Sequence, residues 1–486
     1  MTALDTFKTA LQSAEVHDRV REGLIGEDVH IAGPFGARPL IYADYVASGR
    51  ALTQVEDFVR DRVLPYYANT HTQASFCGEY MSKLREGARA EVARLTGAGA
   101  GMSVVFAGAG STAGINRVVG LLGLSGLVRA GERVVVLTGP YEHHSNILPW
   151  RETGAEVVEI AEAPGGGVDM DDLERALNAA QGAGRIVGTF SAASNVTGIL
   201  TDVDAVTRKL RAHGALAIWD YGCAGPYCEM DMKAGTDAQK DALVFSAHKF
   251  PGGPGASGVL VIRDGIVRRT TPTLPGGGTV NFVSPWGHIY SDRLSTREEG
   301  GTPNVIGDIR VALAMLVKEA LGQGWLDERH EKLRARAVKA WGKNDRIELL
   351  GIPSANALPI FSFRVRDAKG GLLHHQFFTR LLSDLTGIQA RGGCACAGPY
   401  GHRLLGLGKT ESDATIEALG RGDEIAKPGW VRLNFSALMT DEKADTIIAA
   451  VDDLAAVATD YVDQYRVDTG NGRFNSESFP KEMLVS

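Results

Sequence analysis

The sequence predicts an α/β protein in which a mostly parallel central sheet carries helices on both faces and a smaller C-terminal α+β domain follows. Two observations support this fold class. In the middle of the chain, short runs rich in Val and Ile alternate with helical patterns, which is typical of βαβ units. After about residue 305 this alternation ends, and one long helical stretch is followed by isolated strand-like segments.

Six short apolar runs in the central region predict strands, because they are too short for helices and rich in β-branched residues. They are Ser103–Phe106, Arg133–Leu137, Arg185–Phe190, Ala215–Trp219, Ala242–Phe245 and Gly258–Ile262. Helices are expected between them, at Ser111–Leu124, Met170–Ala183 and Val203–His213. In the second helix Leu173 and Leu177 stand four residues apart and mark one apolar face.

The C-terminal region predicts a different mixture of elements. It begins with a long helical stretch at Val305–Lys343, a strand at Pro359–Val365 and a helical run at His374–Thr386. A loop rich in Gly and Cys at Arg391–Gly401, a second strand at Trp430–Phe435 and a closing helix at Thr440–Tyr465 follow. We therefore expect a large domain at residues 41–304 and a small domain at 305–469, with residues 1–40 packing on the small domain. The polar tail 470–486 packs loosely, joins a dimer contact or is disordered.

Composition and charge exclude several classes of function. The chain of 486 residues has a net charge of −7 and no basic stripe, so nucleic-acid binding is not expected. No apolar stretch reaches the ~18 residues that a membrane span needs, and the N-terminus lacks the apolar centre of a secretory signal. Five cysteines in so long a chain do not form a disulfide framework, so we expect a soluble cytoplasmic protein without a metal site.

Glycine-rich and polar segments follow successive predicted strands, at the edge where open α/β sheets bind ligands. Ser111 and Thr112 follow the first strand and begin a helix, where exposed N–H groups favour a phosphate, although Gly-Ser-Thr is also an ordinary helix cap. His143 follows the second strand. Its ring is suited to stacking on a flat cofactor or to acid–base work, and the alternative is a hydrogen-bonded surface histidine.

The third and fourth strands are followed by residues suited to a pyridine ring. Asn195 offers an amide to a phenolic oxygen, or it is a turn residue before Gly198. Asp220 ends a buried strand, where a carboxylate is costly unless it meets a cation such as a protonated pyridine nitrogen. The alternative for Asp220 is the cap of a loop.

Lys249 follows the strand Ala242–Phe245 directly and precedes a run of Gly and Pro. Burial favours the neutral amine, which can form an imine, and Ser246 and His248 beside it can donate to a phosphate. The alternative is a lysine that extends to the surface. Taken in order along one sheet, these residues describe a site for pyridoxal-5′-phosphate (PLP). A nucleotide site would need a third glycine after Gly108 and Gly110.

At this point the chain resembles the class V aminotransferase family, and within it the branch of cysteine desulfurases and selenocysteine lyases. The resemblance runs from about residue 40 to residue 455. It is carried by the Asp220 strand end and by the segments IYADYVAS, ANTH, GSTAGIN, EHHSNILPW, SNVTG, VFSAHK, GGGT, GGTPN and RGGCACAGP. The resemblance implies the PLP-dependent transferase fold type I.

The resemblance also implies a role for each residue of the cofactor site. Four of them hold the phosphate, namely Ser111, Thr112, Ser246 and His248. His143 stacks on the ring, Asn195 meets the phenolic oxygen and Asp220 the ring nitrogen, while Lys249 forms the Schiff base. Thr279 corresponds to a residue that reaches the phosphate of the neighbouring subunit, which implies a homodimer with shared active sites.

The loop Arg391–Pro399 matches the mobile loop of the desulfurases, with Cys396 at the position of the nucleophile. Arg391 and Arg432 match arginines near the substrate carboxylate, for which a guanidinium fork is well suited. In the implied reaction L-cysteine displaces Lys249, which then removes the α-proton with PLP as electron sink. The thiolate of Cys396 attacks the substrate sulfur, leaving alanine and a protein persulfide for a sulfur-acceptor protein.

Three departures from the family pattern leave the substrate open. Cys223 stands where a glutamine is usual, Cys394 replaces a histidine, and the segment Gly406–Pro428 is long and hydrophilic. The Cys-x-Cys spacing resembles the loop of molybdenum-cofactor sulfurases. The alternatives are therefore such a sulfurase, or an aminotransferase, racemase, epimerase or C–S lyase acting on another amino acid. A non-catalytic scaffold is a further alternative, against which the retained Lys249 and Asp220 argue.

Overall fold

The computed structural model describes residues 2–70 and 72–477, and they form two compact units. The first unit takes the described residues of Met1–Ile25, Ser48–Ser194 and Leu200–Trp325. The second takes those of Gly26–Ala47, Asn195–Ile199 and Leu326–Ser486. His71, the last residue of the ANTH segment, and the tail beyond residue 477 lie outside the described residues.

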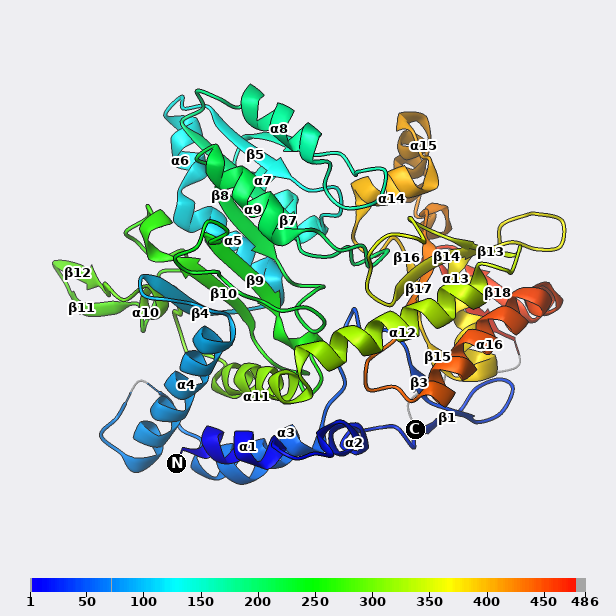
Figure 1. Cartoon of the computed structure of the whole chain (residues 1–486), viewed down its shortest axis with the longest axis horizontal. Coiled ribbons are helices and arrows are strands. Elements are labelled where there is room, and N and C mark those ends of the chain that lie inside the picture. Colours follow the sequence, from blue (N-terminus) through cyan, green and yellow to red (C-terminus); the bar gives the residue numbers. More distant parts are fainter. Residues whose placement is uncertain (1, 71, 478–486) are drawn as a thin grey trace. The chain divides into compact units, whose positions relative to one another are not determined.

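The first unit is built on a seven-stranded sheet (Figure 1) whose strand order is β4-β10-β9-β8-β7-β5-β6. The strands are β4 (Met102–Gly108), β5 (Val134–Thr138), β6 (Glu156–Glu159), β7 (Arg185–Ser191), β8 (Leu216–Asp220), β9 (Ala242–Ser246) and β10 (Gly258–Arg263). Only β10 runs antiparallel to its neighbours, so the expected mostly parallel sheet is confirmed.

Successive side chains of a strand point to opposite faces of a sheet, and both faces are covered. Ile218 of β8 belongs to an apolar cluster with Ile115 and Val118 of α5 (Gly110–Leu122). The next residue, Trp219, donates from Nε1 to Thr207 Oγ1 at 2.9 Å on α9 (Val203–Ala212). Every residue of β8 is buried, as a sheet with helices on both faces requires.

The remaining elements of the first unit are mostly helices and include one exposed hairpin. The helices are α1 (Ala3–Leu11), α2 (Val16–Glu22), α3 (Thr53–Phe58), α4 (Phe76–Leu95), α6 (Leu124–Arg129), α7 (Leu148–Arg151), α8 (Met170–Ala179), α10 (Leu294–Glu298) and α11 (Val305–Leu321). The hairpin pairs β11 (Val280–Ser284) with β12 (Gly287–Tyr290). No helix in the described part of the chain has both the length and the apolar character that crossing a membrane requires.

Two expectations, one about a helix and one about the N-terminal segment, differ from the structure. The long helix expected at Val305–Lys343 is two helices, α11 and α12 (Gln323–Trp341), because Gly322 adopts φ +80 and ends the first. The segment 1–40, expected on the small domain, divides between the units. Residues up to Ile25 group with the first unit, where α1 buries Leu4, Phe7 and Leu11 and contacts α4 and α11.

The second unit is an antiparallel sheet with helices, as expected for the α+β domain. Its strand order is β13-β14-β17-β16, with bounds Ile347–Leu349, Ile360–Val365, Trp430–Asn434 and Arg391–Gly393. Its helices are α13 (His375–Leu381), α14 (Gly398–Leu405), α15 (Lys409–Gly420) and α16 (Asp441–Val457). Three short pairs complete it, β1 (His30–Ile31) with β2 (Arg38–Pro39), β3 (Ile41–Tyr42) with β15 (Ile388–Gln389), and β18 (Tyr465–Asp468) with β19 (Arg473–Ser476).

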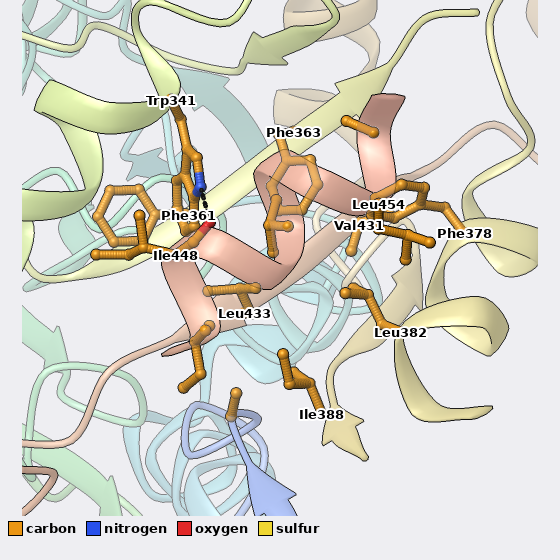
Figure 2. Packing of buried hydrophobic residues seen from close by; sticks show 14 of the residues in the cluster. Trp341, Phe361, Phe363, Phe378, Leu382, Ile388, Val431, Leu433, Ile448 and Leu454 are labelled. Atoms are coloured by element: carbon orange, nitrogen blue, oxygen red, sulfur yellow. Dashed lines mark hydrogen bonds between the residues drawn. The ribbon is translucent and has the colours of Figure 1, made fainter. Parts of the chain in front are cut away.

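The core of the second unit is a cluster of aromatic and aliphatic side chains between its sheet and α16 (Figure 2). Trp341 is fully buried against Phe361 and Phe363, with ring centroids 5.1 and 5.8 Å away. Its indole N–H donates to the carbonyl of Ile448 at 3.2 Å, so the one polar atom of this large side chain is satisfied. This core includes Val431 and Leu433 of β17, the strand that carries Arg432 and pairs with β16, which carries Arg391.

Candidate active site

The predicted phosphate residues Ser111 and Ser246 lie together in the first unit. The N–H of Ser111, in the first turn of α5, donates to Ser246 Oγ at 2.9 Å, and the two hydroxyls are 3.1 Å apart. Gly110 adopts φ +59, and a Cβ there would lie 2.8 Å from Ser246 Oγ and 3.4 Å from the ring of His248. Glycine is therefore required, and three of the four predicted phosphate ligands adjoin the positive end of one helix.

The fourth predicted phosphate ligand, Thr112, lies in the first turn of the same helix. Its hydroxyl lies 2.7 Å from that of Ser145, in the segment that also carries His143. The N–H of Ser145 donates to Nδ1 of His143 at 3.1 Å, so Nδ1 is an acceptor and the neutral ring carries its proton on Nε2. Through Ser145, these two contacts connect the imidazole of His143 to the helix that begins at Gly110.

Asp220 ends β8 as a buried carboxylate, and its surroundings set its charge. Burial raises the pKa of Asp220, while the N–H of Gly222, the nearby charge of Lys249 and the hydroxyl of Ser111 lower it. The Gly222 N–H donates to Oδ1 at 2.7 Å. Lys249 itself is half-buried in a single turn of 3₁₀-helix, Ala247–Lys249, directly after β9. The carboxylate and the amine expected to flank a cofactor ring thus lie near enough for their charges to interact.

A close approach at Gly222 brings two of these residues together. A Cβ on Gly222 would lie 2.6 Å from Ser111 Oγ and 2.8 Å from Asp220 Oδ1, distances that real Cβ contacts do not show. The phosphate serine and the ring-facing carboxylate can therefore sit side by side only because residue 222 has no side chain. No sequence motif points to a role for Gly222.

Glu142 is a second buried carboxylate, and the sequence analysis gave it no role either. Its oxygens accept from the Ser191 N–H and hydroxyl, both at 2.7 Å, and from the Asn146 amide at 2.5 Å. Burial raises the pKa of Glu142 to about 7, against these hydrogen bonds and with a contribution from the charge of Asp220. Glu142 stands next to His143 in the segment that follows the strand ending at Thr138. This position is the sequence signal from which Glu142 could have been identified.

In the second unit, Arg391 and Arg432 lie opposite each other on β16 and β17 and share one partner. Asp44 Oδ1 accepts from Arg432 Nη2 at 3.0 Å, and Oδ2 accepts from Arg391 Nε at 3.0 Å. Burial lowers the pKa of Arg391, but Asp44, Tyr42 and the charge of Cys396 raise it above its usual value. The pair expected at a substrate carboxylate is thus held by Asp44, whose segment IYADYVAS matched the family without a role for this residue.

Asn195 belongs to the same unit and supplies an unsatisfied polar atom. Its Nδ2 donates to the carbonyl of Ala395 at 2.8 Å, and its backbone carbonyl accepts from Arg432 Nη1 at 3.1 Å. Its Oδ1 is buried and has no hydrogen-bond partner among residues 2–70 and 72–477. Buried polar atoms are nearly always paired in native proteins, so this orphan fits a residue that meets a ligand.

The cysteine loop is a tight turn in an unusual conformation. The N–H of Ala397 donates to the carbonyl of Cys394 at 3.2 Å, and the two residues between them, Ala395 and Cys396, have φ +52 and φ +55. A left-handed conformation costs a residue with a Cβ about 1 kcal/mol or more, and such strain concentrates at functional sites. Cys396 is exposed and Cys394 half-buried.

Two further residues named from the sequence are buried, and one segment named from it carries an exposed helix. Cys223 is buried, and its thiol donates to the carbonyl of Ser194 at 3.7 Å. Thr279 is fully buried, and its hydroxyl donates to Gly276 O at 2.6 Å within its own turn, so its contact with a neighbouring subunit stays a prediction. The Gly406–Pro428 segment contains the exposed helix α15 and one turn of 3₁₀-helix at Glu424–Ala426.

Known proteins resemble this chain in sequence and in fold. Residues 41–445 match the family model of class V aminotransferases. A probable cysteine desulfurase of Vibrio cholerae is 30% identical over 423 residues, covering 85% of this chain and 93% of that protein. One of Halalkalibacterium halodurans is 27% identical over 402 residues, covering 80% and 93%. The apo structure of a cysteine desulfurase from Thermococcus onnurineus superimposes with a TM-score of 0.71 at 25% identity, covering 86% of this chain and 94% of that chain.

Proposed function

Because the chain belongs to the class V aminotransferase family, we propose that it is a PLP-dependent enzyme of the cysteine desulfurase type. Its fold is the fold type I of PLP enzymes. The reaction removes sulfur from L-cysteine, or selenium from selenocysteine, and gives alanine and a persulfide on Cys396. The observation that carries the proposal is the buried Asp220 carboxylate at a strand end with the charge of Lys249 acting on it.

The residues of the first unit fit the cofactor. Ser111, Ser246 and the N-terminus of α5 would hold the phosphate, since their donors converge where Gly110 leaves room. His143 would lie against the ring and Asp220 would meet the protonated ring nitrogen, which offsets the cost of burying a carboxylate. When bound, PLP supplies an electron sink for cleavage of the bond between the substrate α-carbon and its hydrogen.

Lys249 has two tasks in this proposal. Its amine would tether the cofactor, and Nζ would accept the α-proton of the bound substrate. Both tasks need the neutral amine within reach of the carboxylate that keeps the ring protonated. Half-burial serves this purpose, because the 3₁₀ turn that carries Lys249 follows directly from the fully buried strand β9.

The residues of the second unit would bind and cleave the substrate. Arg391 and Arg432 present guanidinium groups suited to its carboxylate, held in place by Asp44. The thiolate of Cys396 attacks the substrate sulfur, so an S–S bond forms while the C–S bond breaks, and the carbon keeps the electron pair and takes up a proton to become alanine. The exposure of Cys396 allows a sulfur-acceptor protein to collect the sulfur afterwards.

We further propose a homodimer, supported by the hairpin β11–β12. Four large apolar side chains on it are exposed, Phe282, Val283, Trp286 and Ile289, and Trp286 is 91% exposed. A second copy is the partner that would cover them, and sedimentation of the purified protein checks the mass. A chain that stays monomeric at micromolar concentration would contradict this part of the proposal.

A second candidate keeps PLP but changes the reaction, and Cys223 favours it. Where relatives of the desulfurase branch carry an amide, this chain has a buried thiol bonded to Ser194 O, which cannot replace two amide donors. An aminotransferase, a racemase or epimerase, a C–S lyase or a molybdenum-cofactor sulfurase would then be the activity. Incubating the protein with a panel of amino acids and measuring sulfide, alanine, pyruvate and keto acids separates these reactions.

With a dithiol reductant present, which releases the persulfide sulfur as sulfide, we expect a desulfurase to form sulfide and alanine in equal amounts from L-cysteine, and neither pyruvate nor keto acids. Pyruvate with sulfide indicates a C–S lyase, and keto acids without sulfide an aminotransferase. The purified protein should also absorb as a lysine-bound PLP enzyme, and Lys249→Ala should lose this band. A protein without the band would be a scaffold, not an enzyme.

A further inference from the structure

Cys394 and Cys396 occupy two positions of one hydrogen-bonded turn. The turn is closed by Ala397 N–H to Cys394 O at 3.2 Å, and its two central residues both have positive φ, as in a type I′ turn. Two residues apart, Cα atoms are separated by at most about 7 Å even in extended chain, and a turn shortens this. The Cα separation therefore falls within the range of about 4.4–6.8 Å that disulfides span.

The turn is held from outside by Asn195, whose Nδ2 donates to the carbonyl of Ala395 at 2.8 Å. Neither cysteine is part of a disulfide, and Cys396 is exposed while Cys394 is half-buried. Arg391 lies close enough to Cys396 for the thiolate charge to act on the guanidinium. The loop therefore pairs an accessible sulfur near a cation with a second, more sheltered sulfur at fixed spacing.

We propose that Cys394 is the resolving thiol of Cys396, releasing the sulfur as hydrosulfide and leaving a Cys394–Cys396 disulfide. This inference rests on the proposed function for the persulfide that it consumes. A desulfurase with a single loop cysteine needs an external thiol to release or collect the outer sulfur, whereas here Cys394 can supply the thiol that releases it.

The step balances within the loop. The thiolate of Cys394 attacks Sγ of Cys396, the bond between that Sγ and the outer sulfur breaks, and hydrosulfide leaves with the electron pair. The two cysteines are oxidised by two electrons together, and the outer sulfur is reduced. A dithiol of the cell then returns two electrons and two protons to the disulfide, which readies the loop for another turnover.

The test is a single turnover of the holoenzyme with one equivalent of L-cysteine, without added reductant and in the absence of oxygen. Trypsin cuts after Arg391 and Arg403, so one peptide, residues 392–403, carries both thiols. In the wild type we expect hydrosulfide stoichiometric with the subunit and a peptide lighter by two hydrogen atoms. In Cys394→Ser we expect a peptide heavier by one sulfur atom and hydrosulfide release slower by at least about tenfold.

Cys77→Ser is the matched control, because Cys77 is also half-buried but lies at the start of α4, and it should behave as the wild type. Hydrosulfide release from Cys394→Ser at the wild-type rate would overturn the inference. A wild-type peptide that keeps the extra sulfur, on either cysteine, would overturn it too.

Alanine measured in the same quenched samples separates this inference from the proposed function. Equal alanine from the wild type and Cys394→Ser means that the first half of the reaction is intact and that only resolution is tested. If no variant forms alanine, the proposed function fails. In that case inorganic polysulfide is used to form the persulfide on the loop, and the peptide masses are measured again. If no disulfide forms, the inference is overturned independently of the proposed function.

Discussion

The carboxylate of Asp44 lies 3.0 Å from the guanidinium Nη2 of Arg432, and both side chains are almost fully buried. A buried charge that loses its partner costs about 3–5 kcal/mol, whereas a half-exposed pair is worth about 1 kcal/mol or less. Arg391, the other partner of Asp44, is such a half-exposed side chain. The two arginines therefore share one carboxylate but depend on it very differently.

We expect Asp44→Asn and Arg432→Gln each to lower the free energy of unfolding by about 3 kcal/mol, because each leaves a buried group unpaired. Arg391→Gln should lower it by less than about 1 kcal/mol. Urea unfolding of the three variants measures these values. Equal losses for the two arginine variants would show that burial does not decide the strength of the pair.

Substituting Gly222 by Ala should impair cofactor binding without unfolding the protein. The new Cβ would press on Ser111 Oγ and Asp220 Oδ1, so the phosphate ligand and the ring-facing carboxylate would have to separate. We expect PLP affinity to fall by at least about tenfold, measured by absorbance titration of the apo protein. Gly126→Ala, on α6 with open space around it, is the control that should bind as the wild type.

Glu142 predicts a pH dependence of stability. Its pKa is raised to about 7 from an ordinary value of 4.5, so the folded state binds more protons than the unfolded state between these values. The stability that this raised pKa contributes is fully present below about pH 4.5. It is lost as the pH rises through about 7. Relative to Glu142→Gln, the wild type should lose about 3 kcal/mol of unfolding free energy between pH 5 and 8.

Denaturant unfolding of both proteins across this range checks the prediction, with Glu152→Gln, an exposed carboxylate one helix further along the chain, as control. A constant difference between the wild type and Glu142→Gln at every pH would mean that Glu142 is already ionised at pH 5.

The strands could be predicted from the sequence because Val- and Ile-rich runs end where turns begin. Ala242–Phe245, for example, is extended by one residue in β9. Strand β6, Glu-Val-Val-Glu, was missed because it lies at the edge of the sheet and has only two apolar residues. The hairpin β11–β12 was missed because its apolar side chains face outward, so they follow no core-facing pattern.

The cofactor residues were predictable for a related reason, since ends of parallel strands meet at one edge of a sheet. Ser111 and Ser246 are 135 positions apart and touch. Asp44 could not be found this way, because its partners lie 347 and 388 positions away on strands of another sheet. Gly222 could not be found either, since the lack of a side chain gains meaning only from the atoms beside it.

The most direct test of the nucleophile is the release of sulfide from L-cysteine by Cys396→Ala in the presence of a dithiol reductant, measured beside the wild type after both are shown to carry PLP. We expect sulfide and alanine formation to fall by about a hundredfold or more while the absorbance of the lysine-bound cofactor stays unchanged. Wild-type turnover by Cys396→Ala with intact cofactor absorbance would contradict the assignment of this thiol as the nucleophile.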